Sequence, residues 1–204
     1  MIAILNYGSG NVNAIANIYK KLNIMFKSVT NVDELKNVTK IIIPGVGSFD
    51  EVMQRLETSG IKQKLEELVI EKQIPVLGIC VGMHILGSGS EEGTLPGLNW
   101  IKGKVKKFQN ENSLQYPIPH MGWNELVLNS NHDLIDGLHD PNFYFLHSYY
   151  FECENKSNEL CSTNYNIRFS SLIRKNNIFG IQCHPEKSHD NGVLLLKNFA
   201  KLKC

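Results

Sequence analysis

The sequence has no marked excess of charge of either sign and no long apolar run. Its 204 residues include 21 Lys and Arg against 20 Asp and Glu, which gives a formal net charge of +1 at pH 7. No overall field therefore favours nucleic acid or an anionic membrane as a partner. No apolar run reaches the roughly 20 residues that a membrane-spanning helix needs. We expect neither nucleic-acid binding nor insertion into a membrane.

Cysteine is scarce, and none of it forms a C-x-x-C pair. An odd number of cysteines without such pairs is not typical of a disulfide framework. The first ten residues, MIAILNYGSG, carry no basic leader before their apolar residues and no small-residue cleavage pattern after them. We therefore expect a cytoplasmic protein with reduced thiols. The five cysteines are Cys80, Cys153, Cys161, Cys183 and Cys204.

Short, β-branched apolar runs recur through the first ninety residues. Each run is continuous and ends at Gly, Pro or Asn, a pattern that is typical of a strand buried on both faces. Residues 11–22 and 61–72 lie between these runs and each carry one apolar stripe at helical spacing. The alternation predicts an α/β fold with an open, mostly parallel sheet and helices on both faces. The four runs are residues 2–5, 24–29, 41–45 and 75–79.

The pattern changes after residue 93 to short extended runs. Asn176-Asn177 separates two of them within residues 169–182, a cue for a β-hairpin. We expect these runs to extend the parallel sheet with antiparallel strands. The amphipathic stretch 192–203 predicts a C-terminal helix. Without repeats or a linker, the chain is expected to form one domain, residues 1–204. The other extended runs are residues 100–108, 123–128 and 142–151.

The stretch PVLGICVGMHILG, residues 75–87, places Cys80 between two glycines where an apolar run gives way to helix-forming residues. This pattern predicts a nucleophile elbow, a sharp strand-to-helix turn in which flanking glycines allow backbone segments to approach closely. The elbow would present the Cys80 sulfur at a helix N-terminus, which favours the thiolate. The alternative is a buried thiol that packs as a small hydrophobe.

A base and its orienting partner are predicted in the motif GIQCHPEKS, residues 180–188. His184 and Glu186 are two residues apart, so in an extended chain they share a face about 6.6 Å apart. The carboxylate could then hold the imidazole in one tautomer. The motif alone is a weak signal, but together with Cys80 it supplies nucleophile, base and third group.

The glycine-rich turn in IIIPGVGSFD, residues 41–50, lacks the Lys-Ser/Thr ending of a P-loop and the spacing of a dinucleotide fingerprint. We therefore predict an oxyanion role for it. The backbone N–H groups of Gly45, Val46 and Gly47, with that of Val81 after the nucleophile, could donate to a tetrahedral oxyanion.

The motifs GICVGM, HPEKS and PGVGSF together resemble those of the class I, or triad, glutamine amidotransferases. Within that class, NYGSGN and HMGWN resemble the glutaminase subunits of imidazole glycerol phosphate synthases. The resemblance covers residues 2–202 and implies a flavodoxin-like fold and no cofactor or metal. It implies that Cys80 attacks the carboxamide of L-glutamine, that His184 serves as acid and base, and that Glu186 orients His184.

The resemblance also implies a glutamine pocket and a partner. Ammonia would cross unprotonated to a (β/α)8-barrel cyclase or synthase subunit, with which the chain would form a heterodimer through a dry interface. Four positions match the docking face toward that barrel: Tyr7, Asn11, Trp123 and Lys187. Six positions match glutamine-binding residues: Gly47, His84, Glu92, His147, Ser148 and Tyr149.

The sequence departs from the family pattern at a few positions. His84 stands one helical turn after Cys80, on the same side, where the family usually has glutamine. It is either a tolerated substitution or a sign of an altered pocket or a perturbed thiolate. Asn6 replaces a common aspartate, and LGSGSEEG, residues 86–93, is unusually glycine-rich. A divergent paralogue that supplies ammonia for amidation of a surface-polysaccharide sugar remains an alternative.

Three other hypotheses compete with an amidotransferase. A metal centre at Cys80, Cys183 and His184 lacks a compact ligand pair, because adjacent residues of a strand point opposite ways. A cysteine hydrolase of similar topology, acting on peptides or small thiol adducts, would need no glutamine pocket. A scaffold with an idle triad would function without Cys80.

Overall fold

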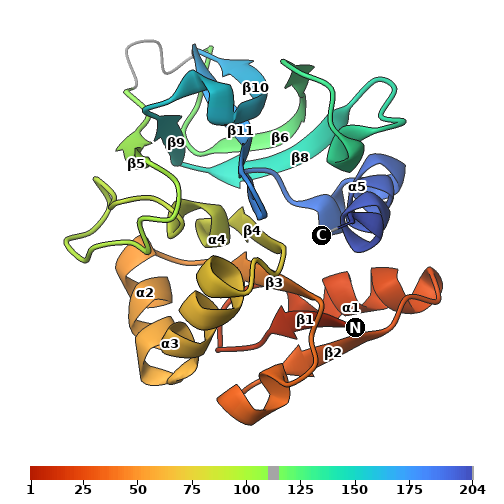
Figure 1. Ribbon diagram of the computed structural model, residues 1–204. Helices are drawn as coiled ribbons and strands as arrows, with labels where there is room; N and C mark the ends of the chain where they lie inside the picture. The colour runs from red at the N-terminus through yellow and green to blue at the C-terminus, as the bar shows by residue number, and fades with distance from the viewer. Residues whose placement is uncertain (110–114, 204) are drawn as a thin grey trace.

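The computed structural model describes residues 1–109 and 115–203, and a parallel sheet forms its centre (Figure 1). The strand order in this part is β2-β1-β3-β4-β12, with every neighbouring pair parallel. The predicted apolar runs are therefore strands. The four runs correspond to β1 (Ile2–Leu5), β2 (Phe26–Val29), β3 (Lys40–Gly45) and β4 (Val76–Cys80). The fifth parallel strand, β12 (Ile178–Ile181), comes from the predicted hairpin within residues 169–182.

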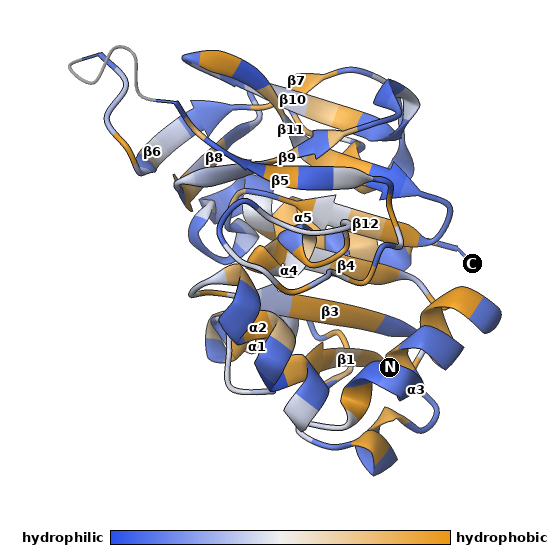
Figure 2. Cartoon of the chain, turned by 90° about the vertical axis from the view of Figure 1, so that its left-hand side faces the viewer, coloured by the Kyte–Doolittle hydropathy of each residue, from blue (hydrophilic) through white to orange (hydrophobic). Residues whose placement is uncertain are grey.

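Helices cover both faces of the parallel strands, as the sequence predicted. Helix α1 (Val12–Lys21) packs beside α5 (His189–Lys201) on one face, where the Tyr19 hydroxyl donates to the Leu196 carbonyl oxygen. Helices α2 (Phe49–Thr58) and α3 (Ile61–Glu66) cover the other face. Figure 2 shows the consequence for hydropathy, because β3 is hydrophobic along most of its length and α2 carries hydrophilic residues.

Helix α2 is an element that the sequence analysis did not predict. The side chain of Ser48 accepts a hydrogen bond from the backbone N–H of Glu51 and so caps the helix. A Ser-x-x-Glu pattern before apolar residues is a start signal for a helix, so the sequence did contain the information. The predicted helix 61–72 is α3 followed by a π-helical turn, η2 (Glu67–Glu71), and α5 begins three residues before the predicted 192.

Antiparallel strands extend the sheet beyond β12, in the order β12-β11-β10-β7, with β9 beside β11 and β5 beside β9. The predicted β-hairpin is confirmed, since Asn176 lies in the turn between β12 and β11 with a φ of 54°. Asn tolerates this left-handed conformation better than most residues. The extension comprises β5 (Gly103–Lys107), β7 (Val127–Leu128), β9 (Tyr149–Cys153), β10 (Glu159–Tyr165) and β11 (Ile167–Lys175).

Strands β6 (His120–Glu125) and β8 (Asn142–His147) form a separate two-stranded sheet, although the sequence predicted that they would extend the main one. Ser148 interrupts the run 142–151, so β8 and β9 belong to different sheets. One face of the small sheet is buried and the other exposed. The exposed face carries Met121 and Trp123 from β6 opposite Leu146 and Tyr144 from β8.

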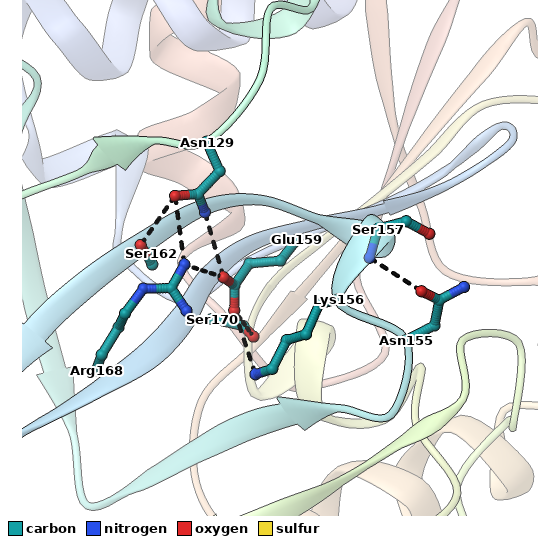
Figure 3. A network of polar contacts seen from close by, with 8 residues as sticks. All are labelled: Asn129, Asn155, Lys156, Ser157, Glu159, Ser162, Arg168 and Ser170. Atoms are coloured by element: carbon teal, nitrogen blue, oxygen red, sulfur yellow. Dashed lines mark hydrogen bonds and ion pairs between the residues drawn. The ribbon is translucent and has the colours of Figure 1, made fainter.

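A polar network around Glu159 joins β10 to β11 (Figure 3). The Glu159 side chain is buried and pairs with Arg168, while the Ser170 hydroxyl donates to its other carboxylate oxygen at 2.5 Å. Asn129 donates to the same carboxylate at 3.3 Å, and Lys156 lies 3.8 Å from it. A buried carboxylate is tolerated only when such partners satisfy it, so the network fixes the pairing of the outer strands.

Short helical turns complete the described chain. They are η1 (Val32–Leu35), η3 (Asp133–Ile135), η4 (Lys156–Asn158), η5 (Pro185–Lys187) and the four-residue α4 (Val81–His84). None of the helices in the described ranges combines the length and the apolar character that a bilayer crossing requires.

Candidate active site

The predicted elbow is present at Cys80. Strand β4 ends at this residue and α4 begins at Val81. The φ of Cys80 is 56°, a value that non-glycine residues rarely adopt and that is concentrated at functional sites. Helix α4 has only four residues, so its dipole is small and other groups must also stabilise a thiolate.

Three glycines allow the backbone of the elbow to pack against its neighbours. A Cβ atom on Gly82 would lie 1.9 Å from the carbonyl oxygen of Ile43 on β3. A Cβ on Gly78 would lie 2.3 Å from the carbonyl oxygen of Gly82, and one on Gly45 would lie 2.3 Å from the Gly82 nitrogen. Backbone atoms cannot yield as a flexible side chain can. The close approach inferred from the sequence is therefore confirmed.

His184 reaches the elbow because β12 pairs in parallel with β4, with Ile181 opposite Ile79. Its Nδ1 lies 2.9 Å from Glu186 Oε1, and both side chains are buried. The sequence analysis assumed an extended chain here, whereas Pro185 starts the 3₁₀ turn η5. Proline suits the first position of a helical turn because its φ is already helical. The turn, rather than a shared strand face, brings the carboxylate to the imidazole.

The pKa of His184 is raised to about 10. Burial acts to lower it, but hydrogen bonding and charge interactions with Cys80 and Glu186 outweigh burial. Beside a thiolate, the His184 ring is therefore an imidazolium at neutral pH. Because Nδ1 is engaged by Glu186, Nε2 is the nitrogen left for proton transfer.

Cys80, His184 and Glu186 line one cavity of about 370 Å³, a size typical of small-ligand sites. Val46 and Val81 from the predicted oxyanion group also line it, whereas Gly45 does not. All six residues matched to glutamine binding lie around this cavity: Gly47, His84, Glu92, His147, Ser148 and Tyr149. The fold thus brings together residues more than 130 positions apart in the chain.

His84 makes a buried contact that the sequence analysis did not foresee. Its Nε2 lies 2.7 Å from the side-chain oxygen of Gln182, whose amide nitrogen lies 3.9 Å from the Cys80 sulfur. Burial lowers the pKa of His84 to about 4, although the hydrogen bond with Gln182 acts in the opposite direction. The ring is therefore neutral, and its Nδ1 has no partner among the described residues.

Comparisons with known proteins agree with this geometry. The family model described as "Glutamine amidotransferase class-I" matches residues 3–202. The chain belongs to the class I glutamine amidotransferases. It is 54% identical over 205 residues to "Imidazole glycerol phosphate synthase subunit HisH" of Leptospira interrogans, covering 99% of this chain and 100% of the relative. It is 50% identical to the protein of the same name in Bdellovibrio bacteriovorus, covering 99% and 100%.

A solved structure shows the same fold. The protein titled "Crystal structure of glutamine amidotransferase" superposes with a TM-score of 0.73 at 18% identity, covering 97% of this chain and 98% of that one. Membership of the family makes the chain a glutamine amidotransferase and supports the α/β fold class predicted from the sequence. Among residues 1–109 and 115–203, no cluster of three or more His, Cys, Asp or Glu side chains could hold a metal ion.

In this amidotransferase, Ser9 holds the peptide at Val46 that the sequence analysis predicted for the oxyanion role. The Val46 N–H donates to Ser9 Oγ at 2.9 Å, and the Ser9 hydroxyl donates back to the Val46 carbonyl oxygen at 2.8 Å. In this arrangement the Val46 N–H is not free for a ligand. Val81 is the first residue of α4, where a backbone N–H has no helical partner, so it suits the oxyanion role better. Sequence reasoning missed Ser9, which lies in the motif NYGSGN.

His147 is held by a chain of hydrogen bonds that starts at Asn124. Its Nδ1 donates to the Tyr149 carbonyl oxygen at 2.8 Å, so its Nε2 accepts from His120 Nδ1 at 2.9 Å. His120 Nε2 then accepts from the Asn124 amide at 3.3 Å. Burial lowers the pKa of His120 to about 4 and holds that of His147 well below its usual value, which keeps both rings neutral. No ring nitrogen of His147 remains for a ligand.

Glu92 connects the cavity to helix α2. Its carboxylate accepts a hydrogen bond from the backbone N–H of Phe49 at 2.8 Å, at the start of that helix. Burial raises the pKa of Glu92, and this hydrogen bond opposes the rise. This hydrogen bond links Glu92 to the first residue of α2.

The four positions matched to the docking face differ in exposure. Trp123 is half exposed and stacks on His189, and Lys187 Nζ lies 5.3 Å above the Tyr144 ring. Asn11 is exposed and caps α1 by accepting from the Ala14 N–H. Tyr7 is buried in the chain, and its hydroxyl donates to the Pro44 carbonyl oxygen. Its hydroxyl therefore contacts β3 from within the chain.

The four cysteines within the described residues are all buried and free, and Cys204 lies outside those residues. Burial raises the pKa of Cys153 to about 11 and that of Cys161 to about 12. Burial also raises the pKa of Cys183 well above its usual value. These three thiols are therefore protonated at neutral pH, unlike the nucleophile that an amidotransferase requires.

Proposed function

We propose that this chain is the glutaminase subunit of an imidazole glycerol phosphate synthase. It hydrolyses L-glutamine and delivers the ammonia to a (β/α)8-barrel partner of the HisF type, which makes imidazole glycerol phosphate and AICAR in histidine biosynthesis. The observation that supports this most is the placement of Cys80, His184 and Glu186 around one cavity. Full-length relatives at 54% and 50% identity carry the name of that synthase subunit.

The proposed mechanism has two proton transfers, both through His184. The Cys80 thiolate attacks the side-chain carboxamide carbon of glutamine, and His184 protonates the nitrogen as the C–N bond breaks. Ammonia leaves, and a glutamyl thioester remains on Cys80. Neutral His184 then takes a proton from water, which attacks the thioester and releases glutamate. Cleavage of the C–S bond restores the thiolate and the imidazolium, which Glu186 orients.

We also propose how the oxyanion is stabilised. The Val81 N–H donates to it, and the N–H groups of Val46 and Gly47 join once the peptide leaves Ser9. The Val46 N–H and the Ser9 hydroxyl currently satisfy each other, which supports a resting state of low activity. Losing one such donor typically costs about 3 kcal/mol in the barrier.

The exposed face of the β6–β8 sheet is the proposed docking surface for the barrel partner. It presents Met121 at 65% exposure and Trp123 at 50%, next to Leu146, which also lines the cavity. An apolar surface that adjoins the site of ammonia release suits a dry passage, because ammonia must cross unprotonated. Residues 1–204 would act as one domain, since one hydrophobic cluster runs from β1 to Leu202. We propose that this domain acts in the cytoplasm.

Reconstitution tests the proposed function. The chain is combined with the barrel synthase subunit from the same organism, and glutamate release is measured with and without the acceptor ligand of that subunit. We expect glutamine-dependent formation of imidazole glycerol phosphate and AICAR, with glutaminase activity well above that of the chain alone. Activation by a sugar-amidating barrel partner instead, with none by the synthase subunit, would overturn the assignment to histidine biosynthesis.

The substitution Met121→Asp is expected to weaken binding of the synthase subunit about 100-fold, because it places a charge at the centre of an apolar interface. Titration calorimetry of the purified subunits measures this. Met25→Asp is the matched control, since Met25 is 72% exposed and precedes β2, far from β6 in Figure 1. The control should bind as the unmodified chain does, with unchanged Tm for both variants. Equal binding by Met121→Asp and Met25→Asp would exclude this docking surface.

A further inference from the structure

A fully buried glutamine, Gln182, connects the nucleophile to His84. It follows β12, and its backbone N–H donates to the Ser171 carbonyl oxygen at 2.9 Å, which fixes the main chain. The two ends of its side-chain amide have different partners. The nitrogen lies 3.9 Å from Cys80 Sγ and the oxygen 2.7 Å from His84 Nε2. Gln182 does not line the cavity that we assign to glutamine, so its contacts are to the protein.

The position of the hydrogen on the His84 ring determines which way this amide points. A neutral imidazole carries one N–H, and the amide oxygen of Gln182 can only accept. With the hydrogen on His84 Nε2, the oxygen faces His84 and the NH₂ group faces the sulfur. The opposite orientation would direct a carbonyl oxygen at the sulfur and repel a thiolate. The tautomer of His84 and the charge on Cys80 are therefore linked through one amide.

We infer that Gln182 is a catalytic residue that donates an N–H hydrogen bond to the Cys80 thiolate, and that His84 is a positioning residue that holds the Gln182 amide in the donating orientation. The inference rests on the proposed function only in treating Cys80 as the nucleophile. It gives His84, the residue that departs from the family pattern, a role behind the sulfur as well as beside the cavity.

Few groups around the Cys80 sulfur can stabilise a negative charge on it. The Leu146 carbonyl oxygen lies 4.0 Å from Sγ and can only accept a hydrogen bond, so it offers no donor to the sulfur. Helix α4 is short, and among the described ionisable neighbours His84, His147 and Cys183 are uncharged at neutral pH for the reasons given above. His184, paired with Glu186, supplies the positive charge. The Gln182 amide adds a donor to the sulfur.

Alkylation of Cys80 tests the inference in the isolated chain. The rate of reaction with iodoacetamide is measured from pH 6 to about 10 by mass spectrometry of the Cys80 peptide, because only the thiolate reacts. Gln182→Met keeps the length and removes the donor, and is expected to slow the reaction about tenfold at pH 7. The difference should shrink as the pH rises, because only the stability of the thiolate relative to the thiol depends on the donor. Loss at every pH equally, or no loss, would overturn the inference.

Variants at His84 keep the test decisive if Gln182→Met fails to fold. His84→Leu leaves Gln182 in place but frees its amide, and should slow alkylation at pH 7 in the same pH-dependent way. His84→Gln retains an N–H donor near the position of Nε2 and should restore most of the rate. The two losses should not add in the double variant, because both act through one amide. Identical rates for His84→Leu and His84→Gln would contradict the positioning role.

The outcome is separable from that of the proposed function, since alkylation needs neither glutamine nor a partner. In the reconstituted complex, Gln182→Met should lower kcat and leave KM for glutamine nearly unchanged. An unchanged kcat in an active complex would overturn the inference and leave the function intact. The expected alkylation pattern in a chain that no synthase subunit activates would support the inference and overturn the proposed function.

Discussion

Replacing Cys80 with alanine is expected to abolish glutamine hydrolysis while the complex still uses free ammonia for synthesis. The substitution removes the only atom that forms the thioester, so we expect glutamine turnover to fall at least about 10⁴-fold. Ammonia added as an ammonium salt bypasses the thioester. The side chain of Cys80 is small and its Cβ is kept, so docking of the partner should persist. Glutamate release and ammonia-dependent product formation are measured on the same preparation.

Cys153→Ala is the matched control, because Cys153 is also buried and free but lies on β9, outside the cavity. It should retain glutamine turnover close to that of the unmodified chain. Turnover that survives in Cys80→Ala would point to an idle triad, as in a scaffold protein. Simultaneous loss of glutamine- and ammonia-dependent synthesis would indicate that Cys80 has a structural role instead.

The substitution Gly82→Ala is expected to destabilise the protein by about 3 kcal/mol or more and to remove glutaminase activity. The new methyl group would lie 1.9 Å from the Ile43 carbonyl oxygen and 3.4 Å from the Gly45 nitrogen. Relief requires β3 and α4 to separate, which disturbs the pairing of Gly45 with Cys80. Urea unfolding gives the free energy of unfolding, and glutamine hydrolysis with the partner gives the activity.

Gly89→Ala provides the comparison, since its Cβ would meet only the Leu95 carbonyl oxygen at 3.9 Å, an ordinary contact. Gly89 lies in the loop after α4, and the change should alter the free energy of unfolding by less than about 0.5 kcal/mol. A Gly82→Ala protein as stable and active as Gly89→Ala would show that the elbow does not depend on close backbone packing.

Local patterns in the sequence predicted much of the architecture. The run at residues 41–45 is buried along its whole length in β3, because helices cover both faces of a parallel sheet and favour continuous apolar strands. The elbow at Cys80 followed from its flanking glycines, since the constraint on the turn acts between near neighbours. Helix α2 was missed, although Ser48 and Glu51 signalled its start. The extended form assumed for Glu186 was overridden by Pro185.

The sequence by itself determined most of the strands of the parallel sheet and indicated Cys80, His184 and Glu186 as the proposed nucleophile, base and orienting carboxylate, because these depend on short spacings. Only the tertiary structure decided what surrounds them. The contacts of Gln182 with His84 and Cys80 span 98 and 102 residues, and the Ser9–Val46 pair spans 37. The first two contacts depend on the placement of β12 beside β4, and the Ser9–Val46 pair depends on the placement of β1 beside β3. A strand order is set by packing across the whole sheet, which no local spacing specifies.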